Sequence, residues 1–546
     1  MKLNIFNVII FPFVVMMVFP GVSFSWFNDP LLNTSVAPNT NIQVEQTAIV
    51  DGNGGTIISW SEQAAGGTGE FDIYAQRLDS KGKPLWPSPV AVCTASFDQG
   101  SPAMIGDEFG GAIIIWGDRR EVANGSPDEL DIYAQRINGN GQVQWATDGI
   151  PVSTASGWQT NQVIAPDGLG GAYIAWDDYR DGNHVYAQRV DQNGQTIWQE
   201  NGLIMRDVPP STSFHQVKPD IVSDGLGGVF IVWTDYQPVS LTNIFAQKLD
   251  HDGNKLWGIE GLAICTELEA QFDAYVASDG FGGAIFTWTD GRLGNNDLDI
   301  YAQRVDVGGN LHWQVQGVPI VTIQENQFVN AMVSDGGGGA ILVWSDTRKQ
   351  NGDTDIYAQR VSAQGALIWD IGGMPVATTD DLQSNPVLIS DGLGGAFITW
   401  QDFFRGGTMW NVYSQHVDGS GLPMWIVDGI AVSIADETQN NPLIIPDGSG
   451  GFINIWSDDR SGTYTNIFAQ QVDNRGLLGG GKFLYYTADK DRNPKTVFTQ
   501  EELIRFTSSW TEAAPLTPGT YQAASIMIIN NFTDFRHETV TYDVIP

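Results

Sequence analysis

The chain has 546 residues, with 63 acidic and 27 basic side chains and a formal net charge of -36. Such a negative field repels phosphate backbones, which argues against a nucleic-acid partner. Only two cysteines are present, which argues against a disulfide-rich scaffold, and Cys93 and Cys265 occupy equivalent places in separate repeats where other repeats have small residues. We therefore expect them to pack rather than to form a disulfide.

Residues 1–25 have the pattern of a cleaved signal peptide. Lys2 gives a basic start, residues 5–19 are almost wholly apolar, and Ser23 and Ser25 supply small residues for cleavage. No later segment approaches the roughly 18 apolar residues that a membrane helix needs. We expect an exported monomer, secreted or periplasmic, with no membrane span.

Residues 26–476 contain an eightfold repeat with a period near 56 residues. In each unit, short apolar runs rich in β-branched and aromatic residues predict four strands. An Asp-Gly-x-Gly-Gly segment predicts a tight hairpin between the first two strands. The clearest marker of the repeat is a tryptophan in the second strand, which recurs as Trp60, Trp116, Trp176, Trp233, Trp288, Trp344, Trp400 and Trp456.

Four antiparallel strands repeated eight times predict an all-β, eight-bladed β-propeller. The last repeat lacks its outermost strand, and residues 26–32 carry the missing sequence at the other end of the chain. We expect this N-terminal segment to complete the last blade and close the ring, which removes exposed sheet edges. Residues 477–546 form a small appended segment, with a capping box at 499–502 that predicts a short helix, and strands near 521–530 and 538–544.

The repeat resembles that of secreted bacterial β-propeller repeat proteins. The units that carry the resemblance read Asp-Gly-x-Gly-Gly-Ala-x-Ile-x-Trp-x-Asp-x-Arg, followed by Asp-Ile-Tyr-Ala-Gln-Arg-Val-Asp. The resemblance covers about residues 26–476 and implies export and a propeller fold. It implies no catalytic site.

Three polar positions recur along the repeats. A glutamine at the start of the innermost strand either caps the backbone of a neighbouring blade or contributes to an amide ring that binds a ligand at the channel mouth; we take Gln216, Gln327 and Gln383 as the ligand-binding candidates. A second glutamine, in the third strand, is predicted to be structural. In five repeats a Trp-x-Asp-x-Arg sequence predicts a bidentate bridge that shapes the following loop.

Repeats three and four are the least regular, and a single active site is expected where the symmetry breaks. Histidine, tyrosine and arginine together can abstract a proton and bind an acidic sugar, as a polysaccharide lyase requires. A solvated loop histidine is the simpler alternative. The catalytic candidates are His215, His184, Tyr179, Arg206 and Tyr236.

Aromatic and acidic loop residues suggest two further kinds of site. Aromatic faces stack on sugar rings, which makes Phe403, Phe404, Trp410 and Trp158 candidate ligand-binding residues, with packing against the C-terminal segment as the alternative. Paired carboxylates suit calcium, and the candidate pairs are Asp297 with Asp299 and Asp353 with Asp355.

The leading functional hypothesis is a non-catalytic propeller that binds a glycan or a protein on a cell surface through its loop face. The alternative is a polysaccharide lyase or hydrolase with its site at the channel mouth near blades three and four. A purely structural envelope or adhesion component is a third hypothesis. Dispersed aromatics with no perturbed acid or base favour binding, whereas a catalytic cluster that converges within hydrogen-bond reach favours the enzyme.

Overall fold

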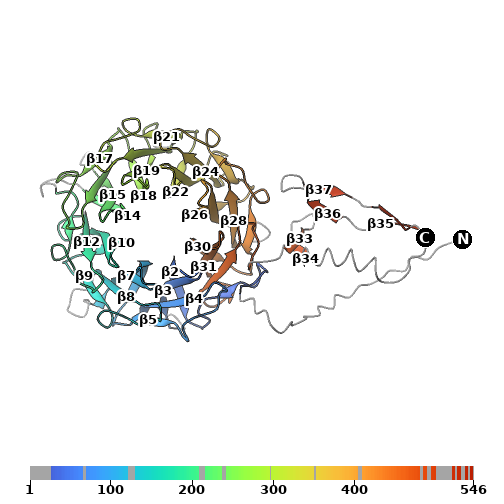
Figure 1. Cartoon of the computed structure of the whole chain (residues 1–546), viewed down its shortest axis with the longest axis horizontal. Coiled ribbons are helices and arrows are strands. Elements are labelled where there is room, and N and C mark those ends of the chain that lie inside the picture. Colours follow the sequence, from blue (N-terminus) through green and yellow to red (C-terminus); the bar gives the residue numbers. More distant parts are fainter. Residues whose placement is uncertain are drawn as a thin grey trace.

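The computed structural model describes residues 26–479, except 65–68, 121–128, 208–214, 237–241, 295–296, 350–351 and 404–408, together with six short strands beyond residue 483. Eight four-stranded antiparallel sheets surround a central axis and form an eight-bladed β-propeller (Figure 1). Strands are the only regular elements among the described residues, where no helix of membrane-spanning length and apolarity occurs. The predicted fold class is confirmed.

In blades 1 to 7 the innermost strand comes first and the chain moves outward, whereas in blade 8 the outermost strand comes from the N-terminal segment. Blade 1 has β2 (Ile42–Val50), β3 (Thr56–Gln63), β4 (Phe71–Leu78) and β5 (Val90–Cys93). Blade 2 has β6 (Gln99–Gly106), β7 (Ala112–Asp118), β8 (Asp131–Ile137) and β9 (Ile150–Ser153). Blade 3 has β10 (Gln159–Pro166), β11 (Ala172–Asp178), β12 (His184–Val190) and β13 (Leu203–Ile204). Blade 4 has β14 (His215–Ser223), β15 (Val229–Tyr236), β16 (Thr242–Leu249) and β17 (Leu262–Cys265).

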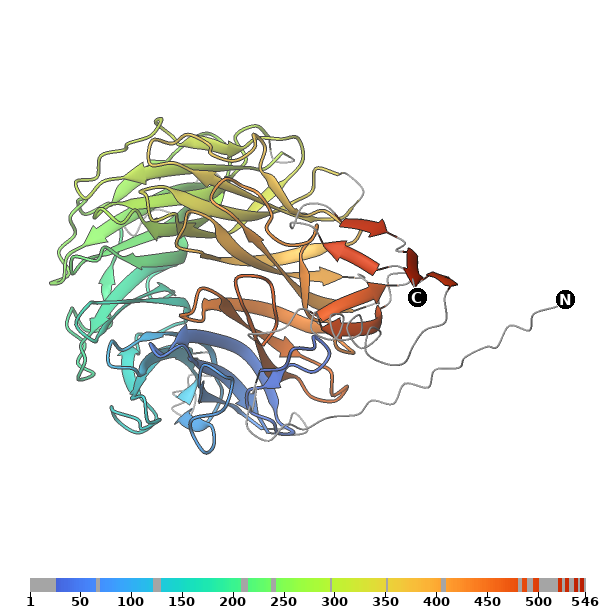
Figure 2. The same ribbon diagram turned by 45° about the vertical axis from the view of Figure 1, so that its right-hand side comes forward.

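The second half of the ring follows the same order, and Figure 2 shows successive blades stacked around it. Blade 5 has β18 (Gln271–Ser278), β19 (Ala284–Asp290), β20 (Asp299–Val305) and β21 (Val318–Val321). Blade 6 has β22 (Gln327–Ser334), β23 (Ala340–Asp346), β24 (Asp355–Val361) and β25 (Met374–Ala377). Blade 7 has β26 (Gln383–Ser390), β27 (Ala396–Phe403), β28 (Trp410–Val417) and β29 (Ile430–Ser433). Blade 8 has β30 (Gln439–Pro446), β31 (Phe452–Asp458), β32 (Asn466–Val472) and the N-terminal β1 (Thr34–Ser35).

The hairpin between the two inner strands depends on its aspartate and glycines. In blade 1 the Asp51 carboxylate accepts hydrogen bonds from the backbone of Asn53 and Gly55, and it pairs with Arg77 at 2.9 Å. A Cβ on Gly55 would lie 2.2 Å from the carbonyl oxygen of Leu78, so no larger residue fits there. The recurring sequence is therefore a requirement of the turn geometry.

The tryptophan series forms the centre of the blade packing. All eight members of the series that begins at Trp60 are fully buried. In blade 2 the Trp116 indole donates to Asp118 at 2.8 Å, and Arg120 bridges the same carboxylate at 2.6 and 2.9 Å while its guanidinium lies 3.8 Å above the Tyr133 ring. The predicted bridge is confirmed as a scaffold feature that joins the end of the second strand to its loop.

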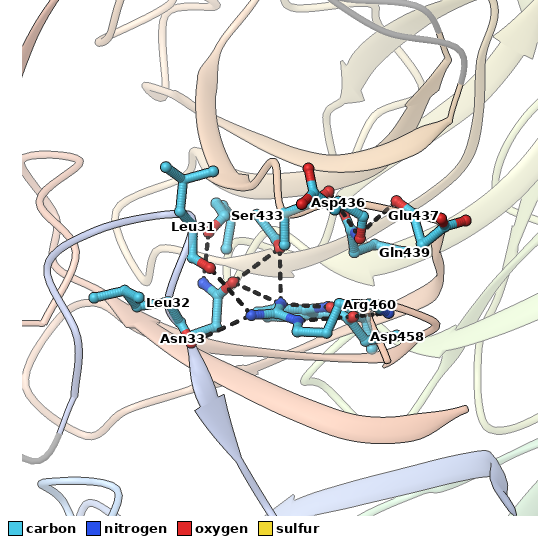
Figure 3. Close-up of polar contacts among 12 residues, drawn as sticks. Leu31, Leu32, Asn33, Ser433, Asp436, Glu437, Gln439, Asp458 and Arg460 are labelled. Atoms are coloured by element: carbon cyan, nitrogen blue, oxygen red, sulfur yellow. Dashed lines mark hydrogen bonds and ion pairs between the residues drawn. The ribbon is translucent and has the colours of Figure 1, made fainter. Parts of the chain in front are cut away.

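The N-terminal segment closes the ring in blade 8. Strand β1 pairs antiparallel with β32, which confirms the closure, but the ladder begins at Thr34 and not within residues 26–32 as expected. Trp26 donates its indole N–H to the carbonyl of Ser80 in blade 1, so this earlier stretch is held at the junction between the last and first blades. Asn33 then contacts Arg460 and Ser433 (Figure 3).

Two smaller predictions concern buried side chains, and both are confirmed. Cys93 and Cys265 are buried and free. The glutamine in the third strand is buried in each blade and bonds to backbone; Gln135, for example, donates to Ala146 and accepts from Arg136 and Trp145.

Beyond residue 483 the structure describes three antiparallel strand pairs: β33 (Leu484–Ala488) with β34 (Pro494–Thr499), β35 (Gly519–Gln522) with β38 (Thr541–Val544), and β36 (Ile526–Ile529) with β37 (Phe535–Glu538). Strands therefore occur near both segments where they were expected. The capping box expected to open a helix begins at Thr499, which ends β34, and residues 500–518, on which the helix would fall, lie outside the described residues.

Candidate functional site

The crossover before β10 and the ends of β11 and β15 bring three exposed aromatic rings to the channel-mouth face of blades 3 and 4. Trp158 precedes β10, Tyr179 follows β11, and Tyr236 ends β15; their side chains are 45%, 45% and 43% exposed. The backbone N–H of Tyr179 donates to the carbonyl of Trp158 at 2.9 Å, which holds these two residues together. We call Trp158, Tyr179 and Tyr236 the aromatic patch.

Both candidate histidines lie beside this patch. His215 begins β14, is exposed, and is the cross-strand partner of Tyr236. His184 begins β12, is half-buried, and is the cross-strand partner of Asp178. Burial lowers the pKa of His184, and the neighbouring His215 lowers it further, so the imidazole of His184 is neutral at physiological pH.

Arg206 does not face the patch. Its guanidinium is buried, pairs with Asp235 at 2.7 Å, and lies 4.1 Å above the Phe245 ring. In five other blades an arginine two residues after the equivalent aspartate makes these contacts, whereas repeat four has glutamine at that position. Arg206 reaches over from the preceding crossover to replace it. The expectation that Arg206 steadies an acidic substrate is therefore corrected: its charge is used inside the blade.

The candidate glutamines are also turned away from the channel. Gln216, Gln327 and Gln383 are fully buried. Each donates from its amide to a backbone carbonyl of the preceding crossover, and Gln216 also accepts from the backbone of Val185 in blade 3. Capping of the neighbouring blade's backbone is therefore seen at Gln216, whereas the buried Oε1 atoms of Gln327 and Gln383 have no hydrogen-bond partner among the described residues. The side chains that do face the channel lie two residues later, at a position that sequence reasoning missed.

The candidate aromatics of blade 7 form a small stack. Phe403 and Trp410 are cross-strand partners at the ends of β27 and β28, both are half-buried, and their ring centroids lie 4.8 Å apart. Phe404 lies outside the described residues. Because the two described rings cover each other, they expose less surface to a ligand than the aromatic patch does.

The carboxylates proposed as calcium ligands are partly engaged in other interactions or partly protonated. In blade 6, Lys349 places its ammonium 2.9 Å from Asp355, two residues beyond Asp353, so the chain supplies its own cation there. In blade 5, burial and the charges of Asp297 and Asp290 raise the pKa of Asp299 to about 7. Over the described part of the chain, no group of three or more His, Cys, Asp or Glu side chains gathers as a metal site would require.

The sequence matches no known protein-family profile and no curated protein. Among solved structures, the chain is similar to an ulvan lyase of polysaccharide lyase family 25, with 12% identity over 71% of this chain and 96% of that chain and a TM-score of 0.43. It is also similar to an endo-arabinase from Bacteroides thetaiotaomicron, with 14% identity, coverage of 49% and 95%, and a TM-score of 0.30. A third similar structure is an α-L-arabinanase from Penicillium chrysogenum, with 12% identity, coverage of 51% and 86%, and a TM-score of 0.31. Likeness at these identities concerns the fold alone.

Proposed function

We propose that this chain is an exported, non-catalytic propeller that binds a neutral glycan through the aromatic patch. The observation that carries the proposal is the exposure of three aromatic rings, 43–45% each, on one face of two adjacent blades. Such rings stack on the apolar faces of sugars, and they are costly to expose without a ligand. The net charge of -36 disfavours an acidic polysaccharide.

The surroundings of the patch favour binding over turnover. A general base needs a group that orients it, and the buried Nδ1 of His184 has no hydrogen-bond partner among the described residues. A lyase also needs a cation for the substrate carboxylate, whereas Arg206 is already paired with Asp235. The described residues around the mouth thus provide stacking surfaces without an assembled acid–base pair.

Binding is tested with the mature chain by affinity electrophoresis in gels that contain xylan, mannan, laminarin or polygalacturonate. We expect retardation by at least one neutral polysaccharide. Each of Trp158→Ala, Tyr179→Ala and Tyr236→Ala should weaken it about three- to tenfold, as the loss of one stacking contact implies. The matched control is Phe281→Ala, whose side chain is 71% exposed on a hairpin at the opposite face. No retardation, or an equal loss in the control, would contradict the proposal.

The neighbouring histidines support a second candidate, an enzyme acting on a polysaccharide at this mouth. A neutral imidazole such as His184 accepts a proton, and His215 stands beside it. Product release from any of the four polysaccharides, lost in His184→Ala and in His215→Ala, would establish this enzyme in place of the binding protein.

A further inference from the structure

The innermost strands carry a recurring bulge that lines the central channel. Two residues after the glutamine that begins each innermost strand, the backbone is left-handed in seven blades, with φ between 50° and 57°. The pairing of the two inner strands shifts register at the same place, which is the mark of a β-bulge. The residues at this position are Glu45, Ser101, Asn161, Lys218, Asp273, Asn385 and Asn441.

The two halves of this ring differ. Across blades 4 and 5, Lys218 and Asp273 form an ion pair at 2.7 Å. Across blades 6, 7, 8 and 1, shorter side chains leave a cavity of about 370 Å³. Its polar lining includes Glu45, Asn330, Asn385 and Asn441, and its apolar lining includes Pro386 and Pro442. We call this space the channel cavity; Figure 1 shows β2, β22, β26 and β30 around that side of the central opening.

The polar groups of the channel cavity retain unused hydrogen-bonding capacity. The side-chain amide of Asn441 makes no hydrogen bond within the described residues. Asn385 donates from Nδ2 to Gln401, which leaves its Oδ1 as an acceptor. Asn330 accepts on Oδ1 from both the N–H and the hydroxyl of Ser345, which leaves its two N–H groups as donors.

The carboxylate of Glu45 is held in place by the scaffold. Its Oε2 accepts from the backbone of Ser101 at 2.6 Å and from the hydroxyl of Ser61 at 2.8 Å, while Oε1 has one long contact of 3.4 Å. Beside it, Gln46 is buried and satisfied, since it donates to the carbonyl of Asn441 and accepts from Ser457. The cavity therefore combines a fixed acceptor with amide donors and acceptors.

We propose that the channel cavity binds one neutral sugar ring, either a free monosaccharide or the terminal unit of a glycan. Hydroxyl groups both donate and accept, which amides match, and the apolar face of a pyranose suits the buried prolines. A uronic or sulfated sugar is disfavoured because it would face the Glu45 carboxylate. This second site does not depend on the aromatic patch.

The test is isothermal titration of the mature chain with glucose, galactose, mannose, N-acetylglucosamine and glucuronate. We expect at least one neutral sugar to bind. Asn441→Gly should weaken binding roughly fivefold, as the loss of about one neutral hydrogen bond implies, without loss of fold because glycine suits its φ of 52°. The control is Asn161→Gly, which has the same bulge at φ 53° outside the cavity and should bind as the parent does.

Two further arms identify the ligand and separate the sites. The parent chain should bind glucuronate more weakly than glucose. Glu45→Gln should improve the binding of glucuronate because it removes the repelling carboxylate. If a trisaccharide of the preferred sugar binds more tightly than the monosaccharide, the natural ligand is a chain end; if not, it is a free sugar. Trp158→Ala should leave monosaccharide binding unchanged even where it abolishes polysaccharide retardation. No binding of any sugar, equal losses in Asn441→Gly and Asn161→Gly, or indifference to the charge of the sugar would overturn the proposal.

Discussion

Replacement of Asn33 by alanine should open the propeller at its closure. The Asn33 side chain is 2% exposed and joins the N-terminal segment to β29 of blade 7 and to Arg460 of blade 8 (Figure 3). Its Oδ1 accepts from Arg460 at 2.9 Å and from the Ser433 hydroxyl at 2.9 Å, and its Nδ2 donates to the carbonyl of Val432 at 3.0 Å. Alanine removes all of these contacts and leaves their partners buried.

The expected cost is about 3 kcal/mol in the local opening free energy of blade 8. Two neutral hydrogen bonds contribute roughly 1 kcal/mol each and the charge-assisted one about 1.5–3 kcal/mol. The sum is reduced because Arg460 keeps its bridge to Asp458 and its contacts with the carbonyls of Leu31 and Leu32. Since every 1.4 kcal/mol is a tenfold factor, amide exchange should quicken about 100-fold.

Hydrogen exchange read by mass spectrometry on the mature chain measures this change strand by strand. Faster exchange is expected in β30, β31 and β32, with β14 to β16 across the ring as the internal reference. The control is Asn193→Ala, in an exposed turn where Asn193 bonds only with Asp191. Equal exchange in blade 8 of both variants would refute the view that Asn33 secures the closure.

Three further outcomes follow from buried groups. Arg206→Met should destabilise the chain by about 3–5 kcal/mol in urea melts because it leaves Asp235 buried without its guanidinium partner. Burial raises the pKa of Asp177 to about 7, so the folded state loses stability as the pH rises from about 4 to 7 and this carboxyl ionises. The melting temperature of Asp177→Asn should therefore rise relative to that of the parent chain as the pH increases from 5 to 8. Burial also raises the pKa of both cysteine thiols to about 12, so maleimide should label Cys93 and Cys265 at pH 8 only after denaturation.

The propeller could be predicted because each blade repeats the same local requirements. The recurrence of Trp60 and its seven equivalents marks the core of each blade. The recurrence of Asp51 and the glycines that follow it marks a tight turn in which larger residues do not fit. The ring closure was predictable for the same reason, since a strand absent at one end was present at the other. The start of the β1 ladder at Thr34, beyond residues 26–32, was not predicted.

The site was harder to predict because its decisive contacts join residues that are distant in sequence. The sequence suggested that Arg206 was free to bind a substrate, because Asp235, which pairs with its guanidinium, lies 29 residues further along the chain. The bulge position was missed because it breaks the alternation of a strand, and a period-two pattern assigns Asn385 and Asn441 no special conformation. An asparagine two residues after the recurrent glutamine was the available signal, since asparagine tolerates a left-handed backbone.

Some polar positions keep the same residue in every blade, whereas the bulge position of the innermost strand varies from blade to blade. The third-strand glutamine recurs in every blade as a structural residue, and Gln135, for example, bonds to backbone through both ends of its amide. The bulge position differs, because the repeat fixes its backbone conformation in seven blades while the identity of its side chain varies. Glutamate, lysine, aspartate, serine and asparagine all occupy it. Substitution there changes the chemistry of the channel while the bulge is kept, which makes it a position where binding specificity can arise on a symmetrical scaffold.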